Sequence, residues 1–388
     1  MGKTSSIIRG NLRQYVMIIA LVSVIILFQI STEGVLLMPL NIANIISQNS
    51  YIFILAVGML LAILTNGNID LSVGSVCAVV GAISAVMVVK MDLPVFLGIG
   101  VGLGIGIIIG MWHGFWIAYA GVPAFIVTLA GMLIFRGLTM VILQGTSLAP
   151  MPDSYKFIAS GFIAPDLQVA GLNLIAMIAG VVASILYVIS QMVSRGNKRK
   201  YGFDVQSYKS LIPQMAGMII IVNAFTYALA SYKGIPMVLV LVIALVAIYT
   251  FITTKTIPGR HIYAYGGNTV AARLSGVNTK KVLFWVYVNM GLLSAVAGIV
   301  FTGRLNSATP KAGVGFELDA IAACFIGGAS TTGGIGTVIG AIVGALLMGV
   351  LNNGMSIMGV SIDWQQTIKG LVLLAAVAFD VYSKSKTK

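Results

Sequence analysis

Long apolar stretches alternate along the chain with short polar segments. A helix that crosses the hydrocarbon core of a bilayer, about 30 Å thick, needs about 20 apolar residues. Twelve stretches come close to this length: 14–30, 50–66, 71–90, 94–118, 123–143, 171–194, 212–231, 236–254, 282–303, 317–333, 335–351 and 363–381. Some contain Gly and polar residues, which predicts short broken helices, because irregular backbone at membrane depth must line a cavity or be buried in protein. The pattern predicts an all-α polytopic membrane protein with about 10–12 transmembrane helices.

Two groups of four stretches, 50–143 and 282–381, show the same order of features. In each group the second stretch begins beside a carboxylate, Asp70 or Asp319, and the third carries Gly at every fourth position. With twelve crossings the two groups enter the membrane from opposite sides, so we expect an inverted repeat with a solute path at its interface. The spaced Gly residues themselves favour close helix packing. We therefore expect one transmembrane domain over residues 1–388, with these groups as its first and second repeats.

Composition and charge agree with this class. Hydrophobic residues make up 59% of the chain and charged residues 9%, whereas a soluble domain carries about 25% charge. With twelve crossings, sixteen of the 23 Lys and Arg residues fall on the side of the N-terminus and five on the other. Because positive loops stay in the cytoplasm, both termini are expected there. Despite a net charge of +13, no hydrophilic segment interleaves basic and aromatic residues, so no nucleic-acid partner is expected.

No pattern in the sequence indicates chemistry within this chain. There is no phosphate-binding loop of the Gly-x-x-x-x-Gly-Lys-Ser/Thr type. The chain has two Cys and two His residues, and none has further ligands at metal-binding spacing. We expect no enzyme, no catalytic residue, no metal and no cofactor in this chain.

Polar residues inside the apolar stretches are candidates for the translocation path or its gate, since they are costly in lipid. These candidates are Asn66, Asn68, Asp70, Arg136 and Asp319. A structural role competes for three of them: Asp70 and Asp319 could cap helix N-termini, and Arg136 could form a structural pair with Asp70 or another polar group. If Asp70, Asp319 and Arg136 instead couple transport to protons or sodium, the chain is a stand-alone secondary sugar transporter, which is the alternative function.

The loop 255–281 is hydrophilic and has an internal pattern. Gly266 and Gly267 are expected to break the chain, and Asn268 to cap a short helix that Gly276 ends. The result would be a helix of two turns between two Gly hinges, parallel to the membrane. It is either a solvated basic loop or a docking helix for a cytoplasmic partner.

Four motifs in this order resemble the permease subunits of bacterial monosaccharide ABC importers, the family that serves ribose, galactose and xylose. They lie at 266–276, at 69–75, at 123–137 and at 318–337, and the resemblance covers nearly the whole chain. Residues 195–254 form an extra basic linker and helical hairpin, which is similar to the xylose and multiple-monosaccharide branch.

The resemblance implies partners and sites. The permease would sit in the bacterial plasma membrane as a homodimer, with a cytoplasmic ABC ATPase that binds ATP and Mg²⁺ and an extracytoplasmic sugar-binding protein. Binding-protein docking would use the outer cations Lys156, Arg304 and Lys311. Coupling to the ATPase would use Gly266, Gly267, Asn268, Ala271, Ala272, Arg273, Leu274 and Gly276.

Overall fold

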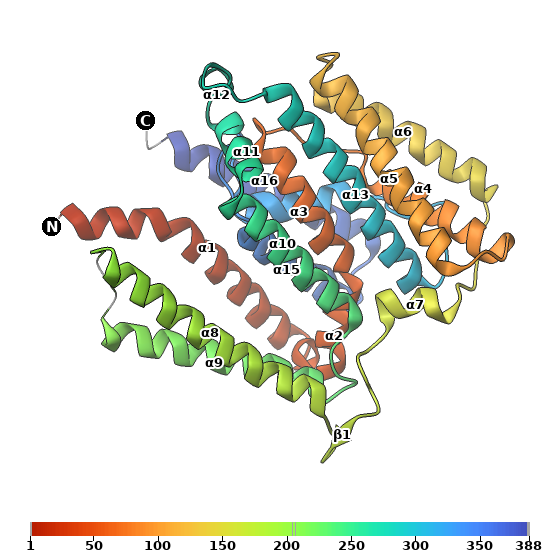
Figure 1. The fold of residues 1–388 in the computed structure, drawn as a ribbon. Helices are drawn as coiled ribbons and strands as arrows, with labels where there is room; N and C mark the ends of the chain where they lie inside the picture. The colour runs from red at the N-terminus through yellow and green to blue at the C-terminus, as the bar shows by residue number, and fades with distance from the viewer. Residues whose placement is uncertain (1, 204, 206, 386–388) are drawn as a thin grey trace. The chain divides into compact units, whose positions relative to one another are not determined.

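The computed structural model describes residues 2–203, 205 and 207–385, and nearly all of its regular structure is helical (Figure 1). The chain forms two compact units: residues 1–36, 45–160 and 238–388, and residues 37–44 and 161–237. The elements up to the middle of the chain are α1 (Gly2–Ser31), η1 (Val35–Leu37), α2 (Pro39–Gln48), α3 (Ser50–Leu64), α4 (Val73–Ala85), the π-helical η2 (Val86–Lys90), α5 (Val95–Ala118), α6 (Ala124–Leu143) and α7 (Asp153–Ser160).

A two-stranded hairpin and nine further helices complete the described part of the chain. They are β1 (Gln168–Val169), β2 (Leu172–Asn173), α8 (Leu174–Lys200), α9 (Tyr208–Ala230), α10 (Met237–Lys255), α11 (Ile257–Gly267), α12 (Thr269–Leu274), α13 (Thr279–Leu305), α14 (Phe316–Ile326), α15 (Val338–Ile357) and α16 (Ile362–Ser385).

The predicted class of an all-α membrane protein is confirmed, but the described residues contain fewer candidate spans than the predicted 10–12. Among the described residues, eight helices are long and apolar enough to cross a membrane, or nine if α2 and α3 form one bent span. Each of the twelve predicted stretches overlaps a helix. However, 317–333 is wrong as a full helical span, because α14 has only 11 residues, or about 16 Å of helix. The backbone is irregular from Gly327 to Thr337 because eight of the eleven residues there are Gly or Thr, which have little helical preference.

Helix α3 is the core of the larger unit. Every residue from Ser50 to Leu64 is buried, as expected of a helix that is hydrophobic on all sides. Helices α13, α14 and α15 pack against it, and α13 also packs along α4 and α5. The polar segments that follow α3 are therefore held inside protein rather than in lipid.

The spaced Gly residues of α5 pack against α13, which confirms the packing interpretation. A Cβ atom on Gly106 would lie 2.6 Å from the carbonyl oxygen of Gly291, and one on Gly110 would lie 2.6 Å from that of Tyr287. Helix backbones approach this closely only where small residues face each other. Gly104, on another face of α5, has no atom within 4 Å of its Cβ position.

This contrast gives a matched pair of variants. Gly106→Val should lower the free energy of unfolding in detergent by about 1–3 kcal/mol, because overpacking forces α5 away from α13. Gly104→Val should change it by no more than about 0.5 kcal/mol. The measurement is a denaturing-detergent titration of both variants, and equal stabilities would contradict this packing.

The smaller unit consists mainly of the antiparallel pair α8 and α9. Asn173 caps α8 by accepting a hydrogen bond from the backbone N–H of Ala176 at 3.0 Å. The Asn223 amide on α9 donates to the Ser184 hydroxyl on α8 at 2.7 Å. The helix pair of this unit therefore extends over 174–230, while α10 belongs to the larger unit. Whether 195–254 is an added segment stays a prediction.

Candidate functional site: a short exposed helix and two broken helices

The short helix predicted in the loop 255–281 is present as α12. Asn268 is its N-cap, and the Asn268 side chain accepts a hydrogen bond from the N–H of Ala271 at 2.9 Å. At the other end Gly276 has φ +85°, and the N–H of Val277 donates to the Ala272 carbonyl at 3.1 Å. This is the left-handed ending that Gly supplies without steric cost. The boundaries predicted for this helix are confirmed.

Helix α12 presents an apolar surface to the outside of the molecule. Val270 is 69% exposed and Leu274 is 84% exposed, and their spacing of four residues puts both on one face. Arg273 beside them is also exposed, whereas Ala272 is buried and holds the helix to the protein. Exposed apolar residues grouped in this way are typical of a docking surface.

The predicted hinge at Gly266 and Gly267 is wrong, because α11 continues through both residues. Gly266 is instead a contact point: its Cβ position lies 1.8 Å from the Leu64 carbonyl oxygen and 2.5 Å from the Gly334 nitrogen. Only a residue without a side chain fits between these backbones. Gly267 has no atom within 4 Å of its Cβ position, and the chain turns at Asn268.

Helix α11 thus lies against Leu64 at the end of α3, from which the irregular segment 65–72 continues, and against the irregular segment 327–337 after α14. The Tyr263 hydroxyl donates to the Gly336 carbonyl at 2.7 Å, and burial raises the pKa of Tyr263, so this hydroxyl stays protonated at neutral pH. The N–H of Gly334 donates to the Leu64 carbonyl at 3.0 Å. These contacts connect α11 to the end of α3 and to segment 327–337.

The two irregular segments also lie against each other. A Cβ atom on Gly67 would be 2.1 Å from the carbonyl oxygen of Thr331, and one on Gly333 would be 2.7 Å from the Cα of Asn66. Asn66 is exposed and has φ +67°. The Asn68 amide donates to the Thr65 carbonyl at 2.7 Å. Two of the candidate path residues therefore shape the turn that follows α3.

The N-terminal ends of α4 and α14 meet in the protein interior. The Cβ position of Gly74 lies 2.0 Å from the Gly313 carbonyl oxygen, and that of Gly313 lies 1.9 Å from the Gly74 carbonyl oxygen. Carboxylates surround this contact, where the helix dipoles favour negative charge. The Oδ1 atom of Asp70 accepts hydrogen bonds from the backbone N–H of Ser72 at 2.8 Å and from the Ser72 hydroxyl at 2.6 Å. Ser72 is the N-cap residue of α4, and this helix start has no side-chain cap hydrogen bond. The expectation that Asp70 caps the helix is therefore wrong; Asp70 binds the N-cap residue instead.

Glu317 is a functional candidate that the sequence reasoning missed. Its side chain is 9% exposed, and its Oε2 atom has no hydrogen-bond partner within the described part of the chain. That oxygen is 2.7 Å from the Cβ position of Gly74, so it points at the first turn of α4. The sequence held one signal for this. Glu317 and Asp319 are two residues apart on a helix, so their side chains point in different directions and only one of the two carboxylates can face α4.

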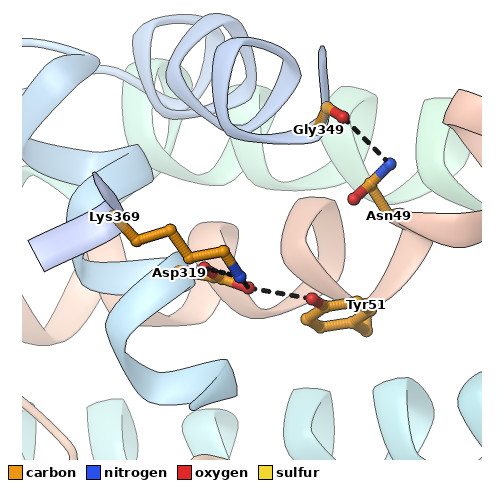
Figure 2. A network of polar contacts seen from close by, with 5 residues as sticks. All are labelled: Asn49, Tyr51, Asp319, Gly349 and Lys369. Atoms are coloured by element: carbon orange, nitrogen blue, oxygen red, sulfur yellow. Dashed lines mark hydrogen bonds and ion pairs between the residues drawn. The ribbon is translucent and has the colours of Figure 1, made fainter. Parts of the chain in front are cut away.

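Asp319 does not cap α14, so that expectation is wrong. Figure 2 shows Asp319 between Lys369 of α16 and Tyr51 of α3. The Lys369 ammonium lies 3.0 Å from Oδ1 and donates to Oδ2 at 3.2 Å, and the Tyr51 hydroxyl donates to Oδ2 at 2.9 Å. The Asp319 side chain is 2% exposed. A buried carboxylate needs such partners, and these contacts join three helices.

Arg136 forms no ion pair with Asp70 in the part of the chain that the structure describes. It lies partly buried on α6. The Asp70 carboxylate is bound by Ser72 instead. The structure therefore does not support the proposed structural pair, and a role of Arg136 at the path stays a prediction.

Helix α12 and helix α7 lie at the two ends of α13 (Figure 1). α12 precedes the first residue of α13, and α7 packs near its last residues, where the Cβ position of Gly303 is 3.2 Å from the Tyr155 carbonyl oxygen. With 27 residues, α13 is about 40 Å long. The two surfaces therefore lie at opposite ends of a helix that is long and apolar enough to cross a membrane.

Comparison with known proteins identifies the chain. The family model described as the permease component of a branched-chain amino acid transport system matches residues 41–377. The chain belongs to this permease family. The xylose transport system permease protein of Haemophilus influenzae is 38% identical over 376 residues, which cover 97% of this chain and 98% of that protein. The xylose permease of Escherichia coli K12 is 38% identical over 97% of this chain and 94% of its own length.

More distant relatives extend the same family. The ribose import permease protein of Haemophilus influenzae is 35% identical over 350 residues, which cover 89% of this chain and 86% of that protein. No solved structure matches the chain. A permease component is a non-catalytic membrane subunit, so the expectation that this chain is not an enzyme and carries no cofactor is confirmed.

The outer cations of the permease differ in their surroundings. Lys156 forms an ion pair with Asp153 at 2.6 Å on α7, and the hydrogen bond from Lys156 lowers the pKa of Asp153. Lys311 is exposed and Arg304 is partly buried at the end of α13. Arg304 is in the last turn of α13, at the end remote from α12, Lys311 follows this end in the chain, and Lys156 is on α7, which packs against α13. Their use in docking a second protein stays a prediction.

Proposed function

We propose that this permease carries a monosaccharide, xylose or a similar pentose, into the cell and that a separate ABC ATPase supplies the energy. The support for the substrate class is the identity of 38% with xylose permeases along nearly the full chain. The description of the matching family model names amino acid transport, and the model matches residues 41–377. The xylose permeases align over 97% of this chain, so a sugar is the better assignment for the substrate.

One observation carries the mechanism: α12 is exposed on its outer face and connected through α11 to both broken segments. In the proposed arrangement, α12 docks on the cytoplasmic ATPase. ATP-driven closure of the ATPase pair pushes α12, and the Gly266 contact passes this movement to segments 65–72 and 327–337. Rigid helices then rock to expose the path to one side at a time.

The meeting of α4 and α14 at Gly74 and Gly313 supports the inverted repeat of 50–143 and 282–381. Two helices that begin inside the protein with their N-termini together match the broken helices that such repeats place at a solute site. Their positive ends and the Asp70 and Glu317 carboxylates offer hydrogen-bonding groups to sugar hydroxyls. Asn66, Asn68 and Arg136 would line the approach to this polar centre.

The proposed assembly contains two copies of the permease, the ATPase and an extracytoplasmic sugar-binding protein. Both termini lie in the cytoplasm, as the distribution of Lys and Arg predicts, and Lys156, Arg304 and Lys311 face the binding protein. A stand-alone ion-coupled transporter is disfavoured because the relatives are permease components of larger systems. In addition, Asp319 is neutralised by Lys369, so it does not offer a free carboxylate for ion binding.

Reconstitution tests the energy source. Vesicles that contain the purified chain alone and carry a proton or sodium gradient should show no uptake of labelled xylose. Uptake should appear when the ATPase, the binding protein and ATP are added. Uptake driven by the ion gradient alone would contradict the proposal.

Substitution on α12 tests the docking surface. Leu274→Asp should weaken association with the ATPase about 10- to 100-fold, since burial of a Leu side chain contributes about 1.5–3 kcal/mol. Ser275→Asp, at the adjacent exposed position, is the control and should keep most of the affinity. Affinity can be measured by titration of labelled ATPase against the permease in detergent. Equal affinity of the two variants would show that α12 is not the docking helix.

A further inference from the structure

A cavity of about 680 Å³ lies in the larger unit between α10, α11 and the first turns of α13. It is separate from the broken segments and from the outer face of α12. Its lining residues are Leu61, Tyr249, Ile252, Pro258, His261, Ile262, Gly276, Asn278, Lys281, Val282, Trp285, Val286 and Asn289. None of the roles proposed above uses this space.

Polar and apolar groups are separated along the cavity. Lys281, His261 and Asn278 lie at the level where α10 ends and α13 begins. Further along α13 most of the lining is apolar, with Val282 and Val286 on one wall, and the hydrogen-bonded side chains of Tyr249 and Asn289 are the polar groups there. A cationic end beside an apolar body is complementary to an amphiphile with an anionic headgroup.

The cavity also offers an unused donor and an opening. The Nδ2 atom of Asn289 is buried and has no hydrogen-bond partner in the described residues, while its Oδ1 accepts from the Tyr249 hydroxyl. An unsatisfied buried donor costs about 1–3 kcal/mol unless a ligand or water binds it. Trp285 lines the cavity and is 53% exposed, as is typical of an aromatic side chain at the membrane interface.

We propose that this cavity binds an anionic phospholipid, with the headgroup phosphate at Lys281 and His261 and an acyl chain along Val282 and Val286. The neighbouring cations Lys255 and Arg260 raise the local concentration of anionic lipid. A free phosphate would fill only the cationic end and leave the apolar walls in water. A zwitterionic lipid would match the walls but would interact less favourably with Lys281.

The position of the cavity gives the lipid an effect on transport, and this second step rests on the proposed function. Gly276, which ends α12, and Asn278, which caps α13 by accepting from the N–H of Lys281 at 3.0 Å, both line the cavity. A bound headgroup would fix the connection between the docking helix and α13. Anionic lipid should therefore increase the amount of sugar transported per ATP hydrolysed.

Native mass spectrometry of the full-length chain in detergent tests the binding. Phosphatidylglycerol should bind with higher affinity than phosphatidylcholine, and Lys281→Gln should weaken its binding about fivefold, the effect of one interfacial cation. Lys280→Gln is the matched control, because Lys280 is exposed and does not line the cavity. Val282→Trp, which fills the apolar body, should also reduce binding.

Several results would overturn the proposal. Equal loss in Lys281→Gln and Lys280→Gln would indicate general surface attraction. Full competition by glycerol phosphate would indicate a phosphate site without an acyl chain, and equal binding of both lipids would exclude headgroup selection. The importer reconstituted with and without phosphatidylglycerol gives a separate readout, the amount of sugar transported per ATP hydrolysed. If this ratio does not change, the lipid has no effect on transport. If Leu274→Asp does not weaken ATPase binding, the proposed function is wrong, but the proposed lipid binding still stands.

Discussion

Replacement of Lys369 by Met is expected to lower the free energy of unfolding by about 3 kcal/mol. The substitution leaves the Asp319 carboxylate buried with Tyr51 as its remaining partner, and removing one member of a buried ion pair costs about 3–5 kcal/mol. We expect the lower end of this range because the Lys369 side chain is 24% exposed. A denaturing-detergent titration of the purified protein, followed by tryptophan fluorescence, measures the change.

Two further variants separate the buried charge from the loss of one side chain. The double variant Lys369→Met with Asp319→Asn should regain most of the stability, since no unpaired charge remains and the amide oxygen still accepts from Tyr51. Lys156→Met removes an ion pair whose Asp153 partner is 97% exposed, and should leave the free energy of unfolding nearly unchanged, because surface ion pairs contribute little. If the double variant is no more stable than Lys369→Met, Asp319 does not depend on the ion pair.

Gly266→Ala is expected to reduce sugar uptake by the reconstituted importer at least about tenfold. Its methyl group would lie 1.8 Å from the Leu64 carbonyl oxygen, so α11 must move away from both broken segments, and overpacking of this kind costs about 1–3 kcal/mol. ATP hydrolysis should continue, because the docking face of α12 is unchanged. Parallel measurement of uptake and ATP hydrolysis in vesicles gives the coupling ratio.

Gly267→Ala is the control for this experiment. Gly267 lies in the same helical turn and has no atom within 4 Å of its Cβ position, and Ala favours the helix by about 1 kcal/mol. Uptake should remain near the level of the unsubstituted protein. If Gly267→Ala lowers coupling as much as Gly266→Ala does, flexibility of the Gly pair, rather than the contact of Gly266, transmits the movement.

Local signals in the sequence were sufficient for the short helix. Asn268 and Gly276 mark its ends because capping and left-handed termination depend on the residue itself and a few neighbours. The same reasoning failed for Gly266 and Gly267. A Gly pair looks like a break in isolation, but whether Gly bends the chain or admits another backbone depends on Leu64 and Gly334, which are distant in sequence.

The carboxylates also differ in whether their contacts are with near neighbours or with residues distant in the sequence. Asp70 was expected to cap α4, but it binds Ser72, the N-cap residue two positions further along the chain. Asp319 was assigned the same role and instead contacts Lys369 and Tyr51, which lie 50 and 268 residues from it in the sequence. Glu317 was missed because its neighbour Gly74 belongs to the other group of helices.

The sequence by itself determined that this is a helical membrane protein, where most helices lie and which family it belongs to. These properties follow from hydrophobic length, charge distribution and motifs that are local in the chain. Only the tertiary structure decided that α14 is a short helix, that α11 lies against the end of α3 and segment 327–337 and that Lys369 neutralises Asp319. Such contacts join residues far apart in sequence, and their energies depend on distances and burial that arise only when the helices pack.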